Sequence, residues 1–173
     1  MTTNIENLMQ LISTAKAAYG SLTVSGDLRK LLIDGANFAE KEADNFVESY
    51  AFIDQTSTGT GFSAAVFQDK KTGKLVFAVR GTEPGTMGDL TSDLLDIGIT
   101  GFANKQSVDM YRYWRQLTTT GGQSVVYSDD EILKLYNLNN GSLSDGKSPL
   151  DHASDLTAFK QKLSTDKGRL SNK

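Results

Sequence analysis

The sequence predicts an α/β fold in which a central β-sheet is flanked by helices. Helical spacing of apolar residues precedes Tyr50, strand-like runs follow from Tyr50 to Val79, and helical spacing returns from about Asn104. Because Leu75–Val79 is almost continuously apolar, we expect that strand to be covered on both faces, as in an α/β layer architecture. The length predicts that residues 1–173 belong to one domain.

Three helices are expected before the strands. Apolar residues recur at helical spacing over Ile5–Ala15 and predict a first helix that runs to about Tyr19. Asp27 is placed to cap a second helix, which should end near Gly35. A third, shorter helix is predicted on the surface over Ala39–Val47.

Three strands are expected, at Tyr50–Ile53, Gly61–Phe67 and Lys74–Val79. The last two should form a hairpin, because the connection Asp69–Gly73 ends in a glycine that supplies the positive φ of a tight turn.

Helices also dominate the second half of the chain. One is predicted from about Asn104 to Leu117, a short segment should begin at Asp129, and a final helix follows Pro149. The helix that begins at Asn104 has a stripe at spacing i, i+3, i+4 and i+7, which is typical of a buried face, so we expect Trp114 to be structural. This stripe consists of Met110, Tyr113, Trp114 and Leu117.

The amino-acid composition disfavours or excludes several classes of function and of site. The net charge of −3 disfavours a basic nucleic-acid binder. The absence of cysteine excludes disulfides, thiolate metal sites and a cysteine nucleophile, and the single histidine, His152, cannot form a multi-histidine metal site. Neither a membrane span nor a cleavable signal peptide is expected, because no apolar run is long enough and Glu6 interrupts the N-terminal region.

The most informative segment is Arg80–Leu94, which follows the apolar strand. Its three glycines and one proline prevent regular structure and permit close backbone approach, and Asp89 can then cap a helix. Open α/β sheets bind ligands at such a loop, where a strand ends and a helix begins. A plain strand-to-helix turn is the structural alternative.

This segment and its neighbours resemble a known family. The runs Phe62–Phe67, Lys70–Glu83 and Asp89–Leu94 look like the N-terminal half of bacterial lipases related to the class 3 lipases, and the similarity continues through Ala103–Thr119. These lipases are α/β-hydrolases. The resemblance implies that the chain is the N-terminal part of a single lipase-like α/β-hydrolase domain, with a central sheet that is incomplete in this chain.

The resemblance also implies roles for particular residues. Thr82 matches the family's oxyanion-hole position, where a backbone N–H, and often a hydroxyl, stabilises the negative charge of a tetrahedral intermediate. An ST-turn that only shapes the loop is the alternative for Thr82. Met87 and Leu90 would suit an acyl-chain groove as substrate-binding residues, and they would equally suit a core.

The sequence departs from the family's pattern at the catalytic triad. An α/β-hydrolase needs a Gly-x-Ser-x-Gly nucleophile elbow followed by an acid and then a histidine, and no such pentapeptide occurs in this chain. His152 precedes the expected nucleophile strand, so it does not match the triad histidine. We therefore expect the serine nucleophile, the acid and the histidine C-terminal of this chain, and we expect the chain alone to be inactive.

The expected function is part of a carboxylic ester hydrolase that acts on triacylglycerols or phospholipids. The alternatives are a catalytically inactive lipase-like domain that binds lipid or a partner, and an unrelated structural domain. The expected partners are the C-terminal remainder of the same protein and a lipid ester, but no nucleic acid. An isolated chain should dimerise or aggregate, because an incomplete sheet leaves an unpaired edge and apolar surface.

No cofactor or metal site is expected within these residues, because acidic pairs such as Asp129-Asp130 lack the ligand spacing of a calcium loop. The resemblance assigns any Ca²⁺-binding repeats to a C-terminal region, and with them expects no N-terminal signal. It further implies a bacterial protein secreted without an N-terminal signal peptide, and a cytoplasmic protein is the other expectation.

Overall fold

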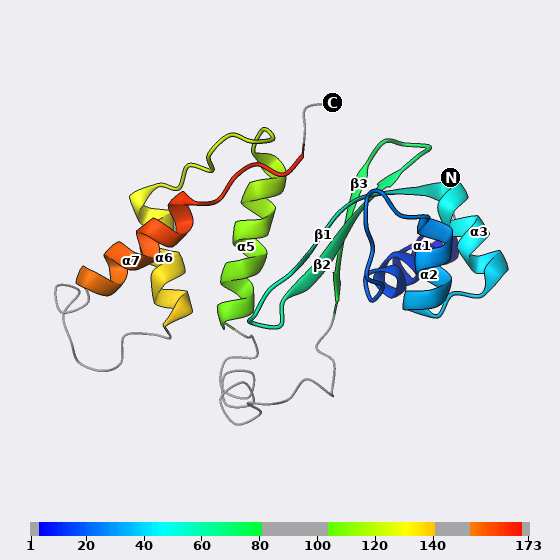
Figure 1. Ribbon diagram of the computed structural model, residues 1–173, viewed down its shortest axis with the longest axis horizontal. Helices are drawn as coiled ribbons and strands as arrows, with labels where there is room; N and C mark the ends of the chain where they lie inside the picture. The colour runs from blue at the N-terminus through cyan, green and yellow to red at the C-terminus, as the bar shows by residue number, and fades with distance from the viewer. Residues whose placement is uncertain (1–3, 81–103, 141–152, 171–173) are drawn as a thin grey trace, which may run out of the picture. The chain divides into compact units, whose positions relative to one another are not determined.

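The computed structural model describes residues 4–80, 104–140 and 153–170, which combine helices with a β-sheet. The chain divides into two compact units, Met1–Thr82 and Glu83–Lys173, and each is described by itself (Figure 1).

Three helices begin the first unit, as the apolar spacing predicts: α1 (Asn4–Ala17), α2 (Leu28–Ala36) and α3 (Glu40–Ser49). The Asp27 carboxylate caps α2 by accepting a hydrogen bond from the Lys30 backbone N–H at 3.3 Å, which confirms the predicted cap. The same helix ends at Asn37, whose φ of 55° is left-handed.

The strands β1 (Tyr50–Ser57), β2 (Ser63–Asp69) and β3 (Leu75–Arg80) form an antiparallel sheet in the order β1-β2-β3. The predicted hairpin between β2 and β3 is confirmed. Its turn uses the positive φ of Gly73, 71°, and the Asp69 carboxylate accepts hydrogen bonds from the backbone N–H groups of Lys71 and Thr72. These contacts fix the register that places Arg80 opposite Ser63.

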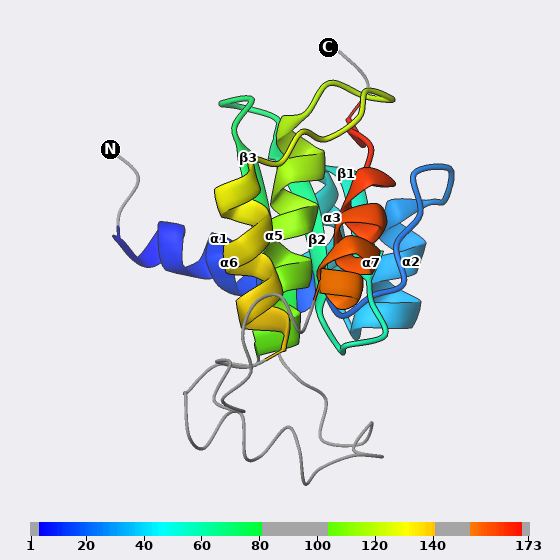
Figure 2. The same ribbon diagram turned by 90° about the vertical axis from the view of Figure 1, so that its left-hand side faces the viewer.

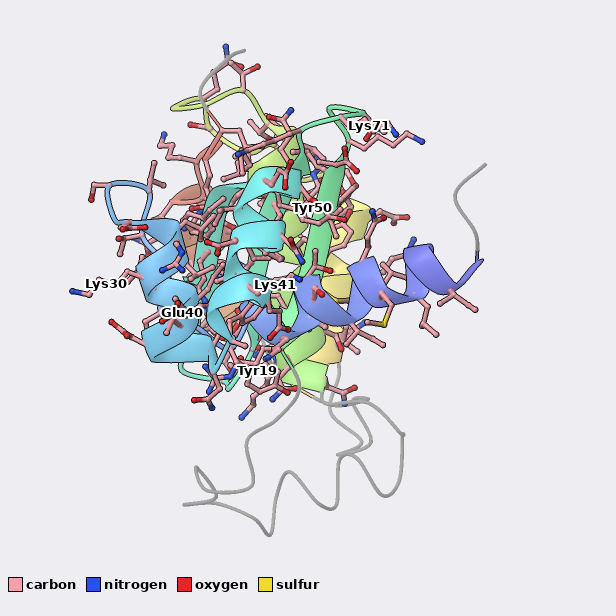
Figure 3. The ribbon with its side chains drawn as sticks, turned by 90° about the vertical axis from the view of Figure 1, so that its right-hand side faces the viewer. Tyr19, Lys30, Glu40, Lys41, Tyr50 and Lys71 are labelled. Carbon is pink, nitrogen blue, oxygen red and sulfur yellow. The ribbon has the colours of Figure 1, made fainter. Side chains whose placement is uncertain are left out.

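The core of the first unit lies between the sheet and its helices, which occupy one side of it in Figure 1. Phe46 of α3 packs edge-to-face against Phe67 of β2, with ring centroids 5.2 Å apart, and is also in contact with Phe38. Tyr50, where α3 passes into β1 (Figure 3), is buried beside Phe46. The predicted surface helix α3 thus contributes a buried side as well.

The expectation that the third strand is covered on both faces is wrong. Leu75 and Val79 of β3 are 52% and 44% exposed, whereas Ser63–Phe67 of β2 is buried at every position. The strand β3 has a hydrogen-bonded neighbour on one side only among the described residues, so its side chains have fewer cross-strand neighbours beside them than those of β2. An almost continuous apolar run therefore does not distinguish a central strand from its neighbour at the edge.

The second unit contains α5 (Asn104–Thr118), α6 (Asp129–Asn139) and α7 (Ala153–Ser164), and α6 is in contact with both other helices (Figure 2). Its core includes Val108 of α5, Leu135 and Tyr136 of α6, and Phe159 and Leu163 of α7. The predicted apolar side of the last helix is thus confirmed.

The expectation of a buried stripe through Trp114 is wrong, because Trp114 is 52% exposed. Tyr113 of the predicted stripe is buried as expected, and α5 also buries Val108 and Asp109, which lie outside that stripe. The buried face of α5 thus includes a charged side chain, Asp109, which forms an ion pair with Arg112 at 3.5 Å.

Isolated bridges connect the segment after α5 to the segment after α7: Thr120 pairs with Leu170, Gly121 with Gly168, and Ser124 with Lys167. Among the described residues, no helix is long and apolar enough to cross a membrane.

Candidate functional site

The end of β3 is the described part of the predicted oxyanion loop. Arg80, the last residue of the strand, lies opposite Ser63 in the hairpin. Its guanidinium carbon is 5.2 Å from the ring centroid of Tyr19, which follows α1 (Figure 3). This distance is that of a cation–π contact, so the start of the loop is joined to the end of the first helix.

The Tyr19 segment is itself fixed to the sheet by one side chain, Gln55 of β1. The Gln55 carbonyl accepts a hydrogen bond from the Leu22 backbone N–H at 2.8 Å, and its amide donates to the Gly20 carbonyl at 2.7 Å. These two hydrogen bonds, one to a backbone N–H and one to a backbone carbonyl, restrain the segment that follows α1. The Tyr19 ring therefore belongs to a restrained segment. Arg80 is therefore held by strand pairing and by a ring on a restrained segment.

Three predicted site residues, Thr82, Met87 and Leu90, lie outside the described residues, as does His152. The structure describes Arg80, which lies two positions before Thr82, together with its strand β3 and its aromatic partner Tyr19.

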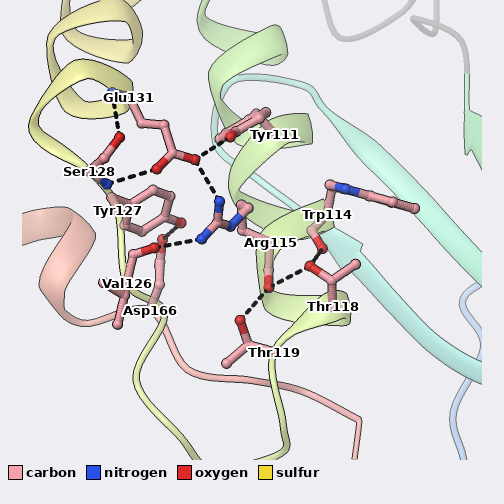
Figure 4. Close-up of polar contacts among 10 residues, drawn as sticks. All are labelled: Tyr111, Trp114, Arg115, Thr118, Thr119, Val126, Tyr127, Ser128, Glu131 and Asp166. Carbon is pink, nitrogen blue, oxygen red and sulfur yellow. Dashed lines mark hydrogen bonds and ion pairs between the residues drawn. The ribbon is translucent and has the colours of Figure 1, made fainter.

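A polar network in the second unit was not predicted (Figure 4). The Glu131 carboxylate of α6 accepts hydrogen bonds from the Tyr111 hydroxyl at 2.5 Å, from Arg115 at 2.5 Å and from the Ser128 backbone N–H at 2.7 Å. The hydrogen bond from Tyr111 is the main cause that lowers the pKa of Glu131, to about 2. Arg115 also donates to the Val126 carbonyl at 2.5 Å.

A second group of charges surrounds Asp166, which is buried after α7. Arg112 of α5 donates to its two carboxylate oxygens at 2.9 and 2.6 Å, and the Tyr127 hydroxyl donates at 2.7 Å. Arg112 also forms an ion pair with Asp109 at 3.5 Å. Burial, followed by the bond to Asp166, raises the pKa of Tyr127 well above its usual value.

These two groups have the chemistry of structural anchors. Each carboxylate accepts hydrogen bonds from an arginine and a tyrosine, so its oxygens are already occupied by partners within the unit. One signal was available in the sequence: Ser128-x-x-Glu131 has the spacing of a capping box, and the structure forms both of its hydrogen bonds. The Arg112–Asp166 pair had no such signal, because 54 positions separate the two residues.

A protein holds a metal ion with several histidine, cysteine, aspartate or glutamate side chains that lie close together. Within residues 4–80, 104–140 and 153–170, no group of three or more histidine, cysteine, aspartate or glutamate side chains could bind one.

No protein-family model matches the chain, and no curated protein or solved structure matches it.

Proposed function

We propose that this chain contributes the oxyanion-hole loop and part of the acyl-binding wall of a carboxylic ester hydrolase of the α/β-hydrolase type. Its substrates would be triacylglycerols or phospholipids. The observation that carries the proposal is the β2–β3 hairpin, whose second strand ends at Arg80, directly before Gly81 and Thr82. A hairpin strand followed by Arg-Gly-Thr is the element that resembles the class 3 lipases.

The proposed chemistry requires a donor that is in place before charge develops. When a serine attacks an ester carbonyl, the carbonyl oxygen becomes negatively charged, and a preset N–H or hydroxyl donor about 3 Å away lowers the barrier by about 3–4 kcal/mol. In the proposal, the Thr82 backbone N–H and hydroxyl are that donor. Met87 and Leu90 would contact the acyl chain.

The arrangement around Arg80 supports this role, because a loop that donates to an oxyanion must begin from a fixed point. Strand pairing with Ser63, the contact with Tyr19 and the Gln55 hydrogen bonds restrain the residue two positions before Thr82. Such restraint reduces the reorganisation needed at the moment of reaction.

The nucleophile is proposed to lie C-terminal of Lys173, together with the acid and the histidine. The 173 residues contain no Gly-x-Ser-x-Gly pentapeptide, and their single histidine, His152, does not match the order serine, acid, histidine. The same sequence facts favour one other function, a catalytically inactive lipase-like domain that binds lipid or a partner.

The test compares two proteins. One is the full product of the natural reading frame that encodes these residues, and the other is the 173-residue chain. We expect the full product to hydrolyse p-nitrophenyl esters and a fluorophosphonate to label a serine beyond Lys173. The 173-residue chain should show neither turnover nor label. Labelling of any serine within the chain would overturn the proposed division of roles, and a full product without turnover or label would favour the inactive binding domain.

A further inference from the structure

The sequence contains a single Asn-Gly pair, Asn140-Gly141, directly after α6. The side-chain carbonyl carbon of an asparagine can be attacked by the backbone nitrogen of the next residue, and water then opens the five-membered ring that forms. Glycine offers the least hindered nitrogen for this attack, because it carries no Cβ. Among the asparagines of the sequence, Asn140 therefore has the most reactive neighbour.

The backbone of Asn140 does not belong to the helix. Asn140 is the C-cap of α6, with φ −100° and ψ 3°, and its side chain is exposed. Ring closure requires the following backbone nitrogen to rotate towards the side chain. A residue inside a helix cannot make this rotation without breaking helical hydrogen bonds, whereas the regular dihedrals of α6 end before Asn140.

Two other asparagines show how the fold protects such residues. The nitrogen that would attack Asn139 is that of Asn140, whose N–H donates to a backbone carbonyl of α6 at 3.1 Å. The nitrogen that would attack Asn37 is that of Phe38, whose N–H donates to the Leu32 carbonyl at 3.2 Å. An N–H engaged in this way must give up its hydrogen bond before its nitrogen can attack. Asn37 and Asn139 are therefore internal references for Asn140.

The carbonyl that would be attacked has a hydrogen-bond donor in place. The Asn139 side-chain amide donates to Asn140 Oδ1, with the two atoms 3.1 Å apart. When a nitrogen attacks Asn140 Cγ, this oxygen becomes negatively charged, and a donor that is already positioned stabilises the charge. The contact therefore favours attack at Asn140 beyond what the Asn-Gly pair alone provides.

We propose that Asn140 deamidates spontaneously and that Asn139 accelerates the reaction. The Gly141 backbone nitrogen forms a bond to Asn140 Cγ, and the bond from Cγ to Nδ2 breaks. Nδ2 leaves as ammonia and takes up the proton of the Gly141 N–H. One water molecule then adds to either ring carbonyl, which yields aspartate or isoaspartate. The inference goes beyond the proposed function, because it concerns a modification of the chain itself.

The product has a new negative charge at the C-terminal end of α6. The carbonyl groups at a helix C-terminus already carry partial negative charge, so a carboxylate there is unfavourable. The last turn of α6 contains no basic residue that could offset it. Deamidation should therefore weaken the end of this helix.

The test incubates the 173-residue chain at mildly alkaline pH and follows each asparagine by peptide mass spectrometry. We expect Asn140 to be converted several times faster than Asn37 or Asn139. Asn139→Ala should slow the conversion of Asn140 roughly two- to tenfold, the factor that corresponds to one net hydrogen bond. Asn139→Asp should slow it as well, because a carboxylate accepts hydrogen bonds but does not donate them.

The matched control is Leu138→Ala, which changes the adjacent side chain and leaves the amide pair intact. Three results would overturn the proposal: conversion of Asn140 no faster than that of Asn37, an unchanged rate in both Asn139 variants, and equal slowing in Leu138→Ala. Circular dichroism of each variant separates a change in rate from a loss of folding. Ester hydrolysis is not measured, so failure of this inference is distinct from failure of the proposed function.

Discussion

Arg112 donates hydrogen bonds to both carboxylate oxygens of Asp166, at 2.9 and 2.6 Å, and thereby joins α5 to the segment that follows α7. Both side chains are largely buried. The planar guanidinium donates one hydrogen bond to each carboxylate oxygen, a paired geometry that the ammonium group of a lysine cannot provide.

Asp166→Asn should destabilise the second unit by about 3–5 kcal/mol, because it leaves the Arg112 charge buried without its carboxylate. Fluorescence of the single tryptophan, Trp114 of α5, can follow the loss during urea unfolding. The control is Asp130→Asn, which removes the highly exposed Lys134–Asp130 pair and should cost at most about 1 kcal/mol. Equal effects of the two changes would contradict a special role for the buried pair.

The stability of the second unit should fall in acid, and Glu131 should account for part of that fall. Its pKa in the folded protein, about 2, lies below the ordinary value of 4.5. The stabilisation from the ionised carboxylate is therefore present above pH 4.5 and is lost as the pH falls towards 2. Thermal unfolding at neutral and acidic pH should show a shallower pH dependence in Glu131→Gln than in Glu48→Gln, an exposed control on α3. Identical slopes would exclude Glu131 as the cause.

Gly168→Ala should destabilise the second unit by about 1–3 kcal/mol or more. A Cβ at this position would lie well under 3.0 Å from the backbone oxygens of Thr119 and Thr120, so the paired segments would have to separate. Gly59→Ala is the control, since a Cβ there meets nothing within 4 Å. Melting temperatures of the two variants measure the difference, and a Gly168→Ala protein as stable as the control would show that the bridges are absent in solution.

In the proposed complete hydrolase, Thr82→Ala should lower kcat roughly a hundredfold with little change in KM, because the proposed hydroxyl contact would strengthen only in the transition state. Thr82→Pro should lower kcat further, since it also removes the backbone N–H. Thr157→Ala, on the exposed side of α7, is the control. An unchanged kcat in Thr82→Ala would remove the hydroxyl from the proposed mechanism and leave the backbone role only.

Much of the fold followed from local chemistry in the sequence. The Asp27 cap and the Asp69–Gly73 turn were predictable, because a carboxylate at a helix start and a glycine in a hairpin act through residues nearby in the chain. The exposure of Leu75 and Trp114 was not, because it depends on which elements lie beside them.

The candidate site was predictable only in part, for the same physical reason. The hairpin that ends at Arg80 could be predicted from the strand patterns. The contact between Arg80 and Tyr19 could not, because it joins positions far apart in the chain. The roles of Thr82, Met87 and Leu90 came from a resemblance and remain predictions.

The order of the strands in the first unit also bears on how the chain folds. Among the described residues, each of β1, β2 and β3 pairs with its neighbour in sequence, so these pairings close short loops. In the second unit, Arg112 must find Asp166 across 54 positions. Because the entropy of loop closure rises with loop length and local contacts form fastest, we expect the pairing of β1, β2 and β3 to form during refolding before the contact that joins Arg112 to Asp166.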